Sequence, residues 1–210
     1  METGFLEISD SEYRAMDGVN QSSLKSILKS PAHYRAALTQ TFEPTPSMAL
    51  GSALHCLVLE PSEFEKRYVV APDDVGTRAS KAYKDFEKES KGRVILKLEE
   101  MDHVRGMLRS VMSHPAAKRM FELDGRAEQA CAWIDPATSL LCKSKLDWLT
   151  ADGVLVDLKT TKDAGEWSFS KSILDYMYHF QAAFYIDGVA KISKQHASAL
   201  SYKIIAVESM

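Results

Sequence analysis

Residues 140–161 read LLCKSKLDWLTADGVLVDLKTT, and this stretch predicts two β-strands joined by a tight turn. Both arms, residues 140–150 and 154–158, are rich in the apolar and β-branched residues that favour strands. Between them lies the sequence Ala-Asp-Gly, in which Gly153 can adopt the positive φ that such a turn requires. We therefore expect a β-hairpin over these residues.

The length of the turn decides which side chains of this hairpin meet. With a three-residue loop, counting back along both strands sets Asp147 opposite Asp157. Because side chains alternate along a strand with a period of two, Asp157 and Lys159 share one face. A two-residue loop would instead place the two aspartates on opposite faces of the hairpin. The functional interpretation therefore depends on a three-residue turn.

Two carboxylates and an amine on one face predict a site for metal-dependent hydrolysis. Facing carboxylates repel each other unless a cation lies between them or one stays protonated. Their hard oxygen atoms suit Mg²⁺ or Mn²⁺, and Lys159 can orient the attacking water and offset phosphate charge. The alternative is a solvated hairpin in which Lys159 only pairs with an aspartate, which contributes little to stability. The apolar run before Asp157 indicates a buried strand and favours the site.

Composition sets wider limits on the class of protein. With 210 residues and 45% hydrophobic residues, the chain is long enough for one globular domain with a substantial core. Its formal net charge of −3 gives no overall sign of nucleic-acid binding, so any DNA contact requires a local basic patch. The three cysteines contain no C-x-x-C pair and are expected to be buried thiols. No membrane-length apolar run and no signal segment is present, so we expect a cytoplasmic protein.

The pattern of apolar residues divides the chain into a helical first part and a mixed second part. After a lead-in over residues 1–19, helices are expected to begin at Asn20 or Ser22 and at Pro31. Further helices are predicted over residues 48–60, 82–89, 98–112 and 116–121, and a proline-rich loop over 41–47. Strands at 128–134 and 199–207, the hairpin and a helix at 169–190 give the order β-β-β-α-β. We predict a single α/β domain, 1–210, with a mainly helical part at 1–125 and a core at 126–210.

Two helical segments carry polar residues with open interpretations. Residues 25–35 are locally basic, which is typical of a solvated helix face but also of a phosphate contact. His55 lies beside the apolar stripe of its helix, where a histidine is usually a core or boundary residue and sometimes a metal ligand. Gln181 and Tyr185 are four residues apart on one helix face, which fits an ordinary boundary pair as well as a site.

Five pieces of the chain together resemble a known family. In order they read SSLKSILKSPAHYRAAL, MALGSALHCLVLEP, LLCKSKLDWL, VLVDLKTT and YHFQAAFY. This series resembles the PD-(D/E)XK nuclease superfamily, and within it the exonuclease VIII (RecE-type) and phage-type exonucleases. The resemblance implies a restriction-endonuclease-like core, in which a central mixed β-sheet is flanked by helices, together with an N-terminal helical region.

The resemblance also implies roles for matching residues. The implied ligands of Mg²⁺ or Mn²⁺ are His55, Asp147, Asp157 and the main-chain carbonyl of Leu158. Lys159 matches the motif lysine, and Glu128 is a candidate auxiliary catalytic acid. Contacts to DNA are predicted for Gln181, Tyr185, Lys143, Lys145, Lys162, Ser22 and Lys25. Relatives often have an arginine just before the aspartate of the first hairpin strand, where Lys145 replaces the forked contact with a point charge.

The activity implied by the resemblance is Mg²⁺-dependent digestion of linear double-stranded DNA. Such enzymes degrade the 5′-ended strand in the 5′→3′ direction and leave 3′ single-stranded tails for phage-type recombination. The implied partners are DNA ends, a single-strand annealing protein and further copies of the chain in a ring trimer or tetramer. The alternatives are an endonuclease on the same core, an inactive DNA-binding or assembly module, and a domain that does not bind nucleic acid.

Overall fold

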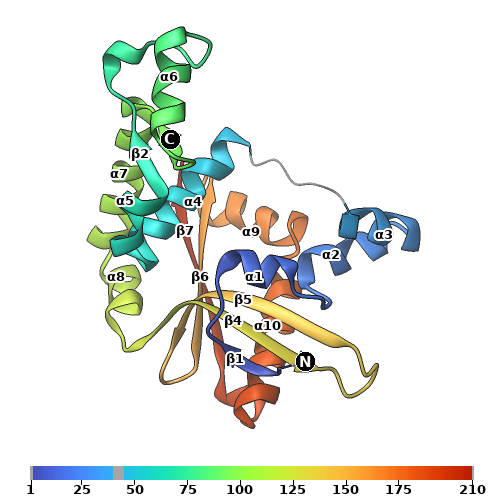
Figure 1. Ribbon diagram of the computed structural model, residues 1–210. Coiled ribbons are helices and arrows are strands. Elements are labelled where there is room, and N and C mark those ends of the chain that lie inside the picture. The colour runs from blue at the N-terminus through green and yellow to red at the C-terminus, as the bar shows by residue number, and fades with distance from the viewer. Residues whose placement is uncertain (1, 40–44, 210) are drawn as a thin grey trace. The chain divides into compact units, whose positions relative to one another are not determined.

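The computed structural model describes residues 2–39 and 45–209, and its central element is a five-stranded mixed β-sheet with the order β1-β4-β5-β6-β7 (Figure 1). The strands are β1 Gly4–Leu6, β4 Gly125–Ile134, β5 Leu141–Thr150, β6 Val154–Thr161 and β7 Ser201–Glu208. Pairing is antiparallel from β1 through β6. β7 runs parallel to β6, since Ser201 N–H donates to Gly153 O (3.2 Å) and Ser209 N–H to Thr161 O (2.8 Å). The predicted α/β class with a mixed sheet flanked by helices is confirmed.

The β5–β6 hairpin has the three-residue turn on which the functional interpretation depends. Trp148 pairs with Val156 and Leu149 with Leu155, so the same register continues to Asp147 opposite Asp157. Gly153 has a φ of +87°, in the left-handed region that the turn requires. The predicted register of the hairpin is confirmed.

The chain forms two compact units that interleave along the sequence. The first comprises residues 1–43, 123–157 and 165–205, and the second comprises residues 44–122, 158–164 and 206–210. β6 and β7 each contribute residues to both units. The expectation of one nuclease domain over residues 1–210, with its two parts, stays a prediction.

The core of the first unit lies between the sheet and helix α10, Tyr178–Ser193. Its buried members are Cys131, Trp133, Cys142, Leu146, Leu149, Leu155, Val189 and Leu200. Helix and sheet approach closely at Gly188, where an added Cβ would lie 2.6 Å from the ring of Trp133. That contact requires glycine, and it fixes α10 against β4. Phe184 packs on the same ring, with centroids 5.1 Å apart.

The single helix predicted over residues 169–190 is wrong, because the structure has two. Helix α9, Glu166–Asp175, ends before Tyr176, and α10 begins at Tyr178. Between them Met177 has a φ of +55°, and its N–H donates to Leu174 O (3.1 Å) in a tightened last turn. Apolar residues continue with helical spacing through this break, so periodicity alone did not reveal it.

The lead-in expected over residues 1–19 has structure of its own. β1 forms the edge of the sheet, and it is followed by helix α1, Asp10–Ala15. Ser9 caps α1 and forms a reciprocal capping box with Glu12. The helix expected to begin at Asn20 or Ser22 is capped by Asn20. It comprises α2, Gln21–Lys25, and a 3₁₀ turn η1, Ser26–Leu28, before α3, Pro31–Thr39.

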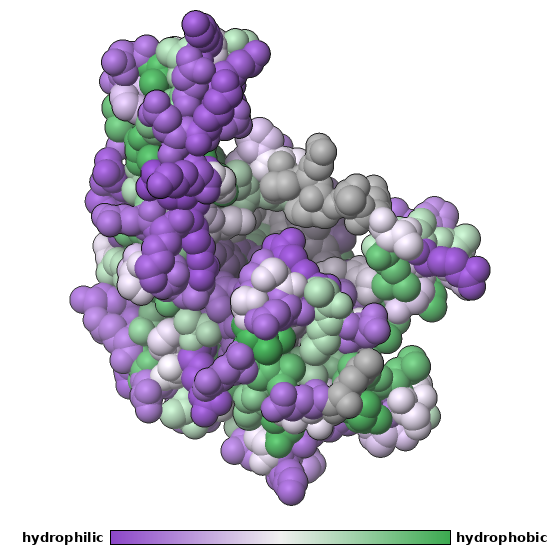
Figure 2. Space-filling view, in the orientation of Figure 1, coloured by the Kyte–Doolittle hydropathy of each residue, from purple (hydrophilic) through white to green (hydrophobic). Residues whose placement is uncertain are grey.

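The second unit is built on two packed helices, α4, Pro46–Leu59, and α7, Leu98–Ser113, whose inward side chains include Leu54 and Val104. Its other elements are η2 Pro61–Glu63, α5 Phe64–Arg67, β2 Tyr68–Val70, η3 Asp73–Val75, α6 Lys81–Glu89, β3 Val94–Leu96 and α8 Pro115–Glu122. β2 and β3 form a small parallel pair, which the sequence did not predict. The exposed side of α6 carries mostly charged residues, and Figure 2 shows this hydrophilic surface. The predicted loop at 41–47 lies mostly outside the described residues.

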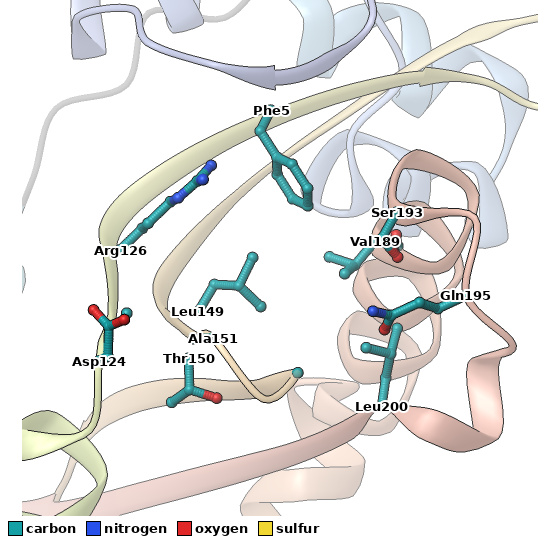
Figure 3. A pocket seen from close by; sticks show the side chains of 12 residues that line it. Phe5, Asp124, Arg126, Leu149, Thr150, Ala151, Val189, Ser193, Gln195 and Leu200 are labelled. Carbon is teal, nitrogen blue, oxygen red and sulfur yellow. Dashed lines mark hydrogen bonds between the residues drawn. The ribbon is translucent and has the colours of Figure 1, made fainter.

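A cavity of about 510 Å³ lies in the first unit beside the β5–β6 turn. Figure 3 shows Arg126 and Phe5 on one side of it and Val189, Ser193 and Leu200 on the other. The guanidinium carbon of Arg126 lies 5.6 Å from the centroid of the Phe5 ring. The residues that line this cavity include none of the predicted site residues.

Two expectations from composition can be compared with the structure. All three cysteines are buried free thiols, as predicted. In the described part of the chain, no helix combines the length and the apolar character needed to cross a membrane.

Candidate metal centre

Three carboxylates lie opposite one another on adjacent strands of the sheet. Ala127 pairs with Trp148 and Gln129 with Leu146, so Glu128 on β4 lies opposite Asp147 on β5. The hairpin register then sets Asp147 opposite Asp157 on β6. A carboxylate oxygen of Glu128 lies within 4.8 Å of one of Asp147. We call Glu128, Asp147 and Asp157 the acidic row.

The backbone at Glu128 is distorted. Its φ is +48°, in the left-handed region that non-glycine residues rarely adopt, although β4 keeps the same register on both sides of it. Such a conformation costs on the order of 1–3 kcal/mol and persists only where the surrounding structure holds it. Strain of this kind concentrates at functional sites, so the conformation of Glu128 supports a role for its carboxylate.

A neutral hydrogen-bond donor on α10 holds the Asp157 carboxylate. The side chain is buried, with 3% of the residue exposed, and Oδ1 accepts a hydrogen bond of 2.7 Å from Gln181 Nε2. The same Nε2 lies 2.9 Å from the hydroxyl oxygen of Tyr202 on β7. Burial raises the pKa of Tyr202, and the charge of Asp157 raises it further. The phenol therefore stays protonated beside the carboxylate.

Tyr185 also lies beside the acidic row, one helical turn beyond Gln181 on α10. Burial raises the pKa of Tyr185 well above its usual range, and the nearby Tyr13, Asp157 and Asp147 raise it further. Its ring meets that of Tyr202 edge-on, with centroids 6.4 Å apart. The structure thus brings the predicted pair Gln181 and Tyr185 to the acidic row.

Glu128 is held by a cation. Lys145 Nζ lies 2.7 Å from Glu128 Oε2 and 3.0 Å from Asp10 Oδ1 at the start of α1. Burial lowers the pKa of Lys145, but the charges and hydrogen bonds of Glu128 and Asp10 outweigh burial and leave the pKa raised. Lys145 therefore remains an ammonium ion next to the acidic row.

Three other predicted DNA contacts form hydrogen bonds within the first unit. Lys143 is buried, and its Nζ donates to Tyr13 O (2.9 Å) and to Met16 O. Lys25 Nζ donates to Tyr176 O (2.7 Å). Ser22 is exposed and accepts a hydrogen bond of 2.9 Å from Gln21. The carbonyl contacts of the two lysines depend on tertiary structure, which the sequence pattern did not indicate, and the DNA contacts stay predictions.

The second unit carries the remaining predicted residues. Leu158 is buried on β6, Lys159 is half-buried, and Lys162 just after the strand is exposed. α4 lies against this part of β6, since a Cβ on Gly51 would come within 3.1 Å of Thr160 Oγ1. His55 is four residues after Gly51 and therefore shares its helix face. The roles of these residues in a site stay predictions.

Two residues near the acidic row were not predicted. Asp10 lies in the N-terminal segment, where the capping box of Ser9 and Glu12 was a readable helix signal. Tyr202 lies in the last strand, and no local pattern connects it to Asp157. Only the fold brings both side chains to the row.

Comparisons with known proteins give a family and a fold. A family model described as "PDDEXK-like domain of unknown function (DUF3799)" matches residues 20–209. No curated protein matches the chain. The fold is similar to that in a crystal structure titled "Putative exonuclease" from Eubacterium rectale, with a TM-score of 0.67 over 98% of this chain and 74% of that chain. The two sequences are 12% identical, so this likeness concerns the fold.

Proposed function

Since the chain belongs to the PDDEXK-like family that its residues 20–209 match, we propose that it is a metal-dependent deoxyribonuclease. The acidic row is the observation that carries this proposal. Carboxylates opposite one another on neighbouring strands repel unless a cation lies among them. Their donor atoms are all hard oxygens, which suit Mg²⁺ or Mn²⁺ and fit poorly with softer metals.

The residues of the row would hold the ion as follows. The proposed ligands are Asp147, Asp157 and the carbonyl of Leu158. Glu128 is the auxiliary acid, and its carboxylate lies near enough to Asp147 to bind the same ion as an exchangeable ligand. A divalent ion bound there would lower the pKa of a water molecule and offset the charge that develops on the phosphate. Gln181 would keep Asp157 in one orientation, because its hydrogen bond to Oδ1 fixes that carboxylate.

Lys159 is the proposed partner of the attacking water. Its position two residues after Asp157 places both side chains on one face of β6. The ammonium would orient the water at Nζ and offset phosphate charge. His55, on the α4 face that meets β6, is the proposed nitrogen ligand by resemblance.

We further propose that the substrate is the end of linear double-stranded DNA. The resemblance to RecE-type exonucleases supports 5′→3′ digestion, 3′ tails for recombination, a strand-annealing partner and a ring of subunits, in the cytoplasm. The proposed DNA contacts are Gln181, Tyr185, Lys143, Lys145, Lys162, Ser22 and Lys25.

Digestion of end-labelled linear duplex with Mg²⁺ tests the proposal. Wild-type protein should release nucleotides from linear DNA, leave covalently closed circular DNA intact, and lose activity with EDTA. Asp157→Asn should abolish release while the protein stays folded. Asp187→Asn is the matched control, since this exposed carboxylate of α10 pairs with Lys191, and its loss should leave activity unchanged.

The other outcomes separate the alternatives. Cleavage of the circular duplex would identify an endonuclease. DNA binding without any metal-dependent release would identify an inactive binding module. Full activity in Asp157→Asn would refute the assignment of the acidic row.

A further inference from the structure

The ammonium of Lys145 lies between two carboxylates that belong to different parts of the first unit. Glu128 Oε2, at 2.7 Å, belongs to the acidic row, and Asp10 Oδ1, at 3.0 Å, belongs to α1. The Lys145 and Glu128 side chains are 21% and 23% exposed, whereas Asp10 is 51% exposed. Asp10 is also bound by Arg14 Nε at 2.6 Å through its other oxygen, Oδ2. Lys145 therefore pairs with a more buried carboxylate, Glu128, and with a more exposed one, Asp10.

We propose that Lys145 is the counter-cation of the acidic row when no metal is bound. When a divalent ion binds, Lys145 releases the Glu128 carboxylate and stays paired with Asp10. In this arrangement Lys145 is a positioning residue that sets the affinity for metal. The inference rests on the proposed function, because it assumes that the row binds a metal ion.

Lys145 and a divalent ion compete for the Glu128 carboxylate, because both are cations and both need the same space. An ammonium 2.7 Å from Glu128 occupies one oxygen of the carboxylate and repels a divalent ion that approaches the row. Without Lys145 the row would hold three neighbouring carboxylates on adjacent strands, which disfavours the folded chain until metal binds. Lys145 therefore stabilises the metal-free fold and at the same time weakens metal binding.

Asp10 determines what happens to the ammonium when metal arrives. A half-buried ammonium that loses its partner is costly, so Glu128 is released more readily if a second carboxylate remains. Asp10 is such a partner, because Arg14 holds its other oxygen and keeps the carboxylate in place. Burial raises the pKa of Asp10, but Lys145 and Arg14 outweigh it and lower that pKa, so Asp10 is ionised at neutral pH. Lys145 and Asp10 should therefore affect metal binding with opposite signs.

Titration calorimetry with Mn²⁺ alone, without DNA, tests this inference. Lys145→Met should bind Mn²⁺ about tenfold more tightly than wild type, because the competing charge is removed. Asp10→Asn should bind about threefold more weakly, because Lys145 is left with Glu128 as its only carboxylate partner. The double variant should match Lys145→Met, since Asp10 acts only through Lys145. Thermal unfolding in EDTA should show a lower Tm for Lys145→Met, and excess Mn²⁺ should restore it.

Lys191 offers matched controls, because it also lies between two carboxylates of the first unit, Asp187 and Asp135. Lys191→Met and Asp135→Asn should leave Mn²⁺ affinity unchanged. Unchanged or weaker binding in Lys145→Met, or unchanged binding in Asp10→Asn, would overturn the inference while the proposed function stands. An absence of Mn²⁺ binding in wild type would overturn both. If Lys145→Met fails to fold, the half-exposed Asp10→Asn still decides the matter.

Discussion

The two ends of the acidic row are stabilised in different ways. At one end Asp157 is 3% exposed and accepts a hydrogen bond from the neutral amide of Gln181. At the other end the Glu128 side chain is 23% exposed, has a left-handed backbone and pairs with the ammonium of Lys145. A neutral amide can stay bound to a carboxylate that also binds metal, whereas an ammonium competes with the metal for the same charge. The comparison indicates a fixed ligand at Asp157 and an exchangeable one at Glu128.

The surrounding elements account for the difference. The groups around Asp157 come from α10 and β7, and α10 is fixed by the contact of Gly188 with Trp133. The partner of Glu128 is Lys145 on the neighbouring strand, and Lys145 is held in turn by Asp10 of α1, a helix of six residues with no buried member. Hence a well-packed core supports one end of the row, and a short surface helix supports the other.

The largest expected effect separates the two carboxylates directly. Asp157→Asn should lower the rate of nucleotide release from linear duplex by about a thousandfold or more, because a fixed anionic ligand becomes neutral. Glu128→Gln should lower it by only about ten- to a hundredfold, as expected for an auxiliary group. Initial rates at saturating Mg²⁺ measure both changes. Equal losses would break the distinction between a fixed and an exchangeable ligand.

The next effect concerns the donor that holds Asp157. Gln181→Leu should lower the free energy of unfolding by about 1–3 kcal/mol, because a buried carboxylate oxygen loses its hydrogen bond. The same variant should lose about ten- to a hundredfold in activity, as outer partners of metal ligands typically do. Urea unfolding and initial rates measure these quantities. Gln195→Leu, at an exposed position after α10, is the matched control, and an equal loss there would remove the special role of Gln181.

The close contact between α10 and β4 gives an effect of similar or smaller size. Gly188→Ala should destabilise the protein by about 1–3 kcal/mol, because its Cβ would lie 2.6 Å from the Trp133 ring in a packed core. Gly106→Ala in α7 is the matched control, since, apart from the backbone of α7 itself, an added Cβ there would meet only the end of the Arg109 side chain, 4.0 Å away. That control should gain about 0.5–1 kcal/mol from helix propensity. If Gly188→Ala leaves the free energy of unfolding unchanged, the contact with Trp133 does not hold α10 firmly enough to fix Asp157.

The sequence predicted those features of the site that depend on neighbouring residues. The hairpin, its three-residue turn and the pairing of Asp147 with Asp157 follow from strand-forming arms and Gly153, and the structure has them. The break at Met177 was missed, because helical periodicity continues through it. The left-handed backbone of Glu128 and the contact of Lys145 with Asp10, 135 positions apart, have no local signal. Long-range contacts of this kind arise only when the sheet and α1 come together.

The smallest expected effect is a pH dependence at the exchangeable end. The pKa of Asp10 is lowered in the fold, so its contribution to stability is present above about pH 4 and is lost as pH falls through the lowered value. Because Asp10 is half exposed, this contribution should be only a few tenths of a kcal/mol. Wild type should therefore exceed Asp10→Asn in unfolding free energy at about pH 5.5, and the difference should be smaller at about pH 3. Urea titrations at both values measure the difference. A gap that does not shrink at low pH would mean that Asp10 acts through packing, and the contrast between a cation-held and an amide-held carboxylate would then lose its electrostatic basis.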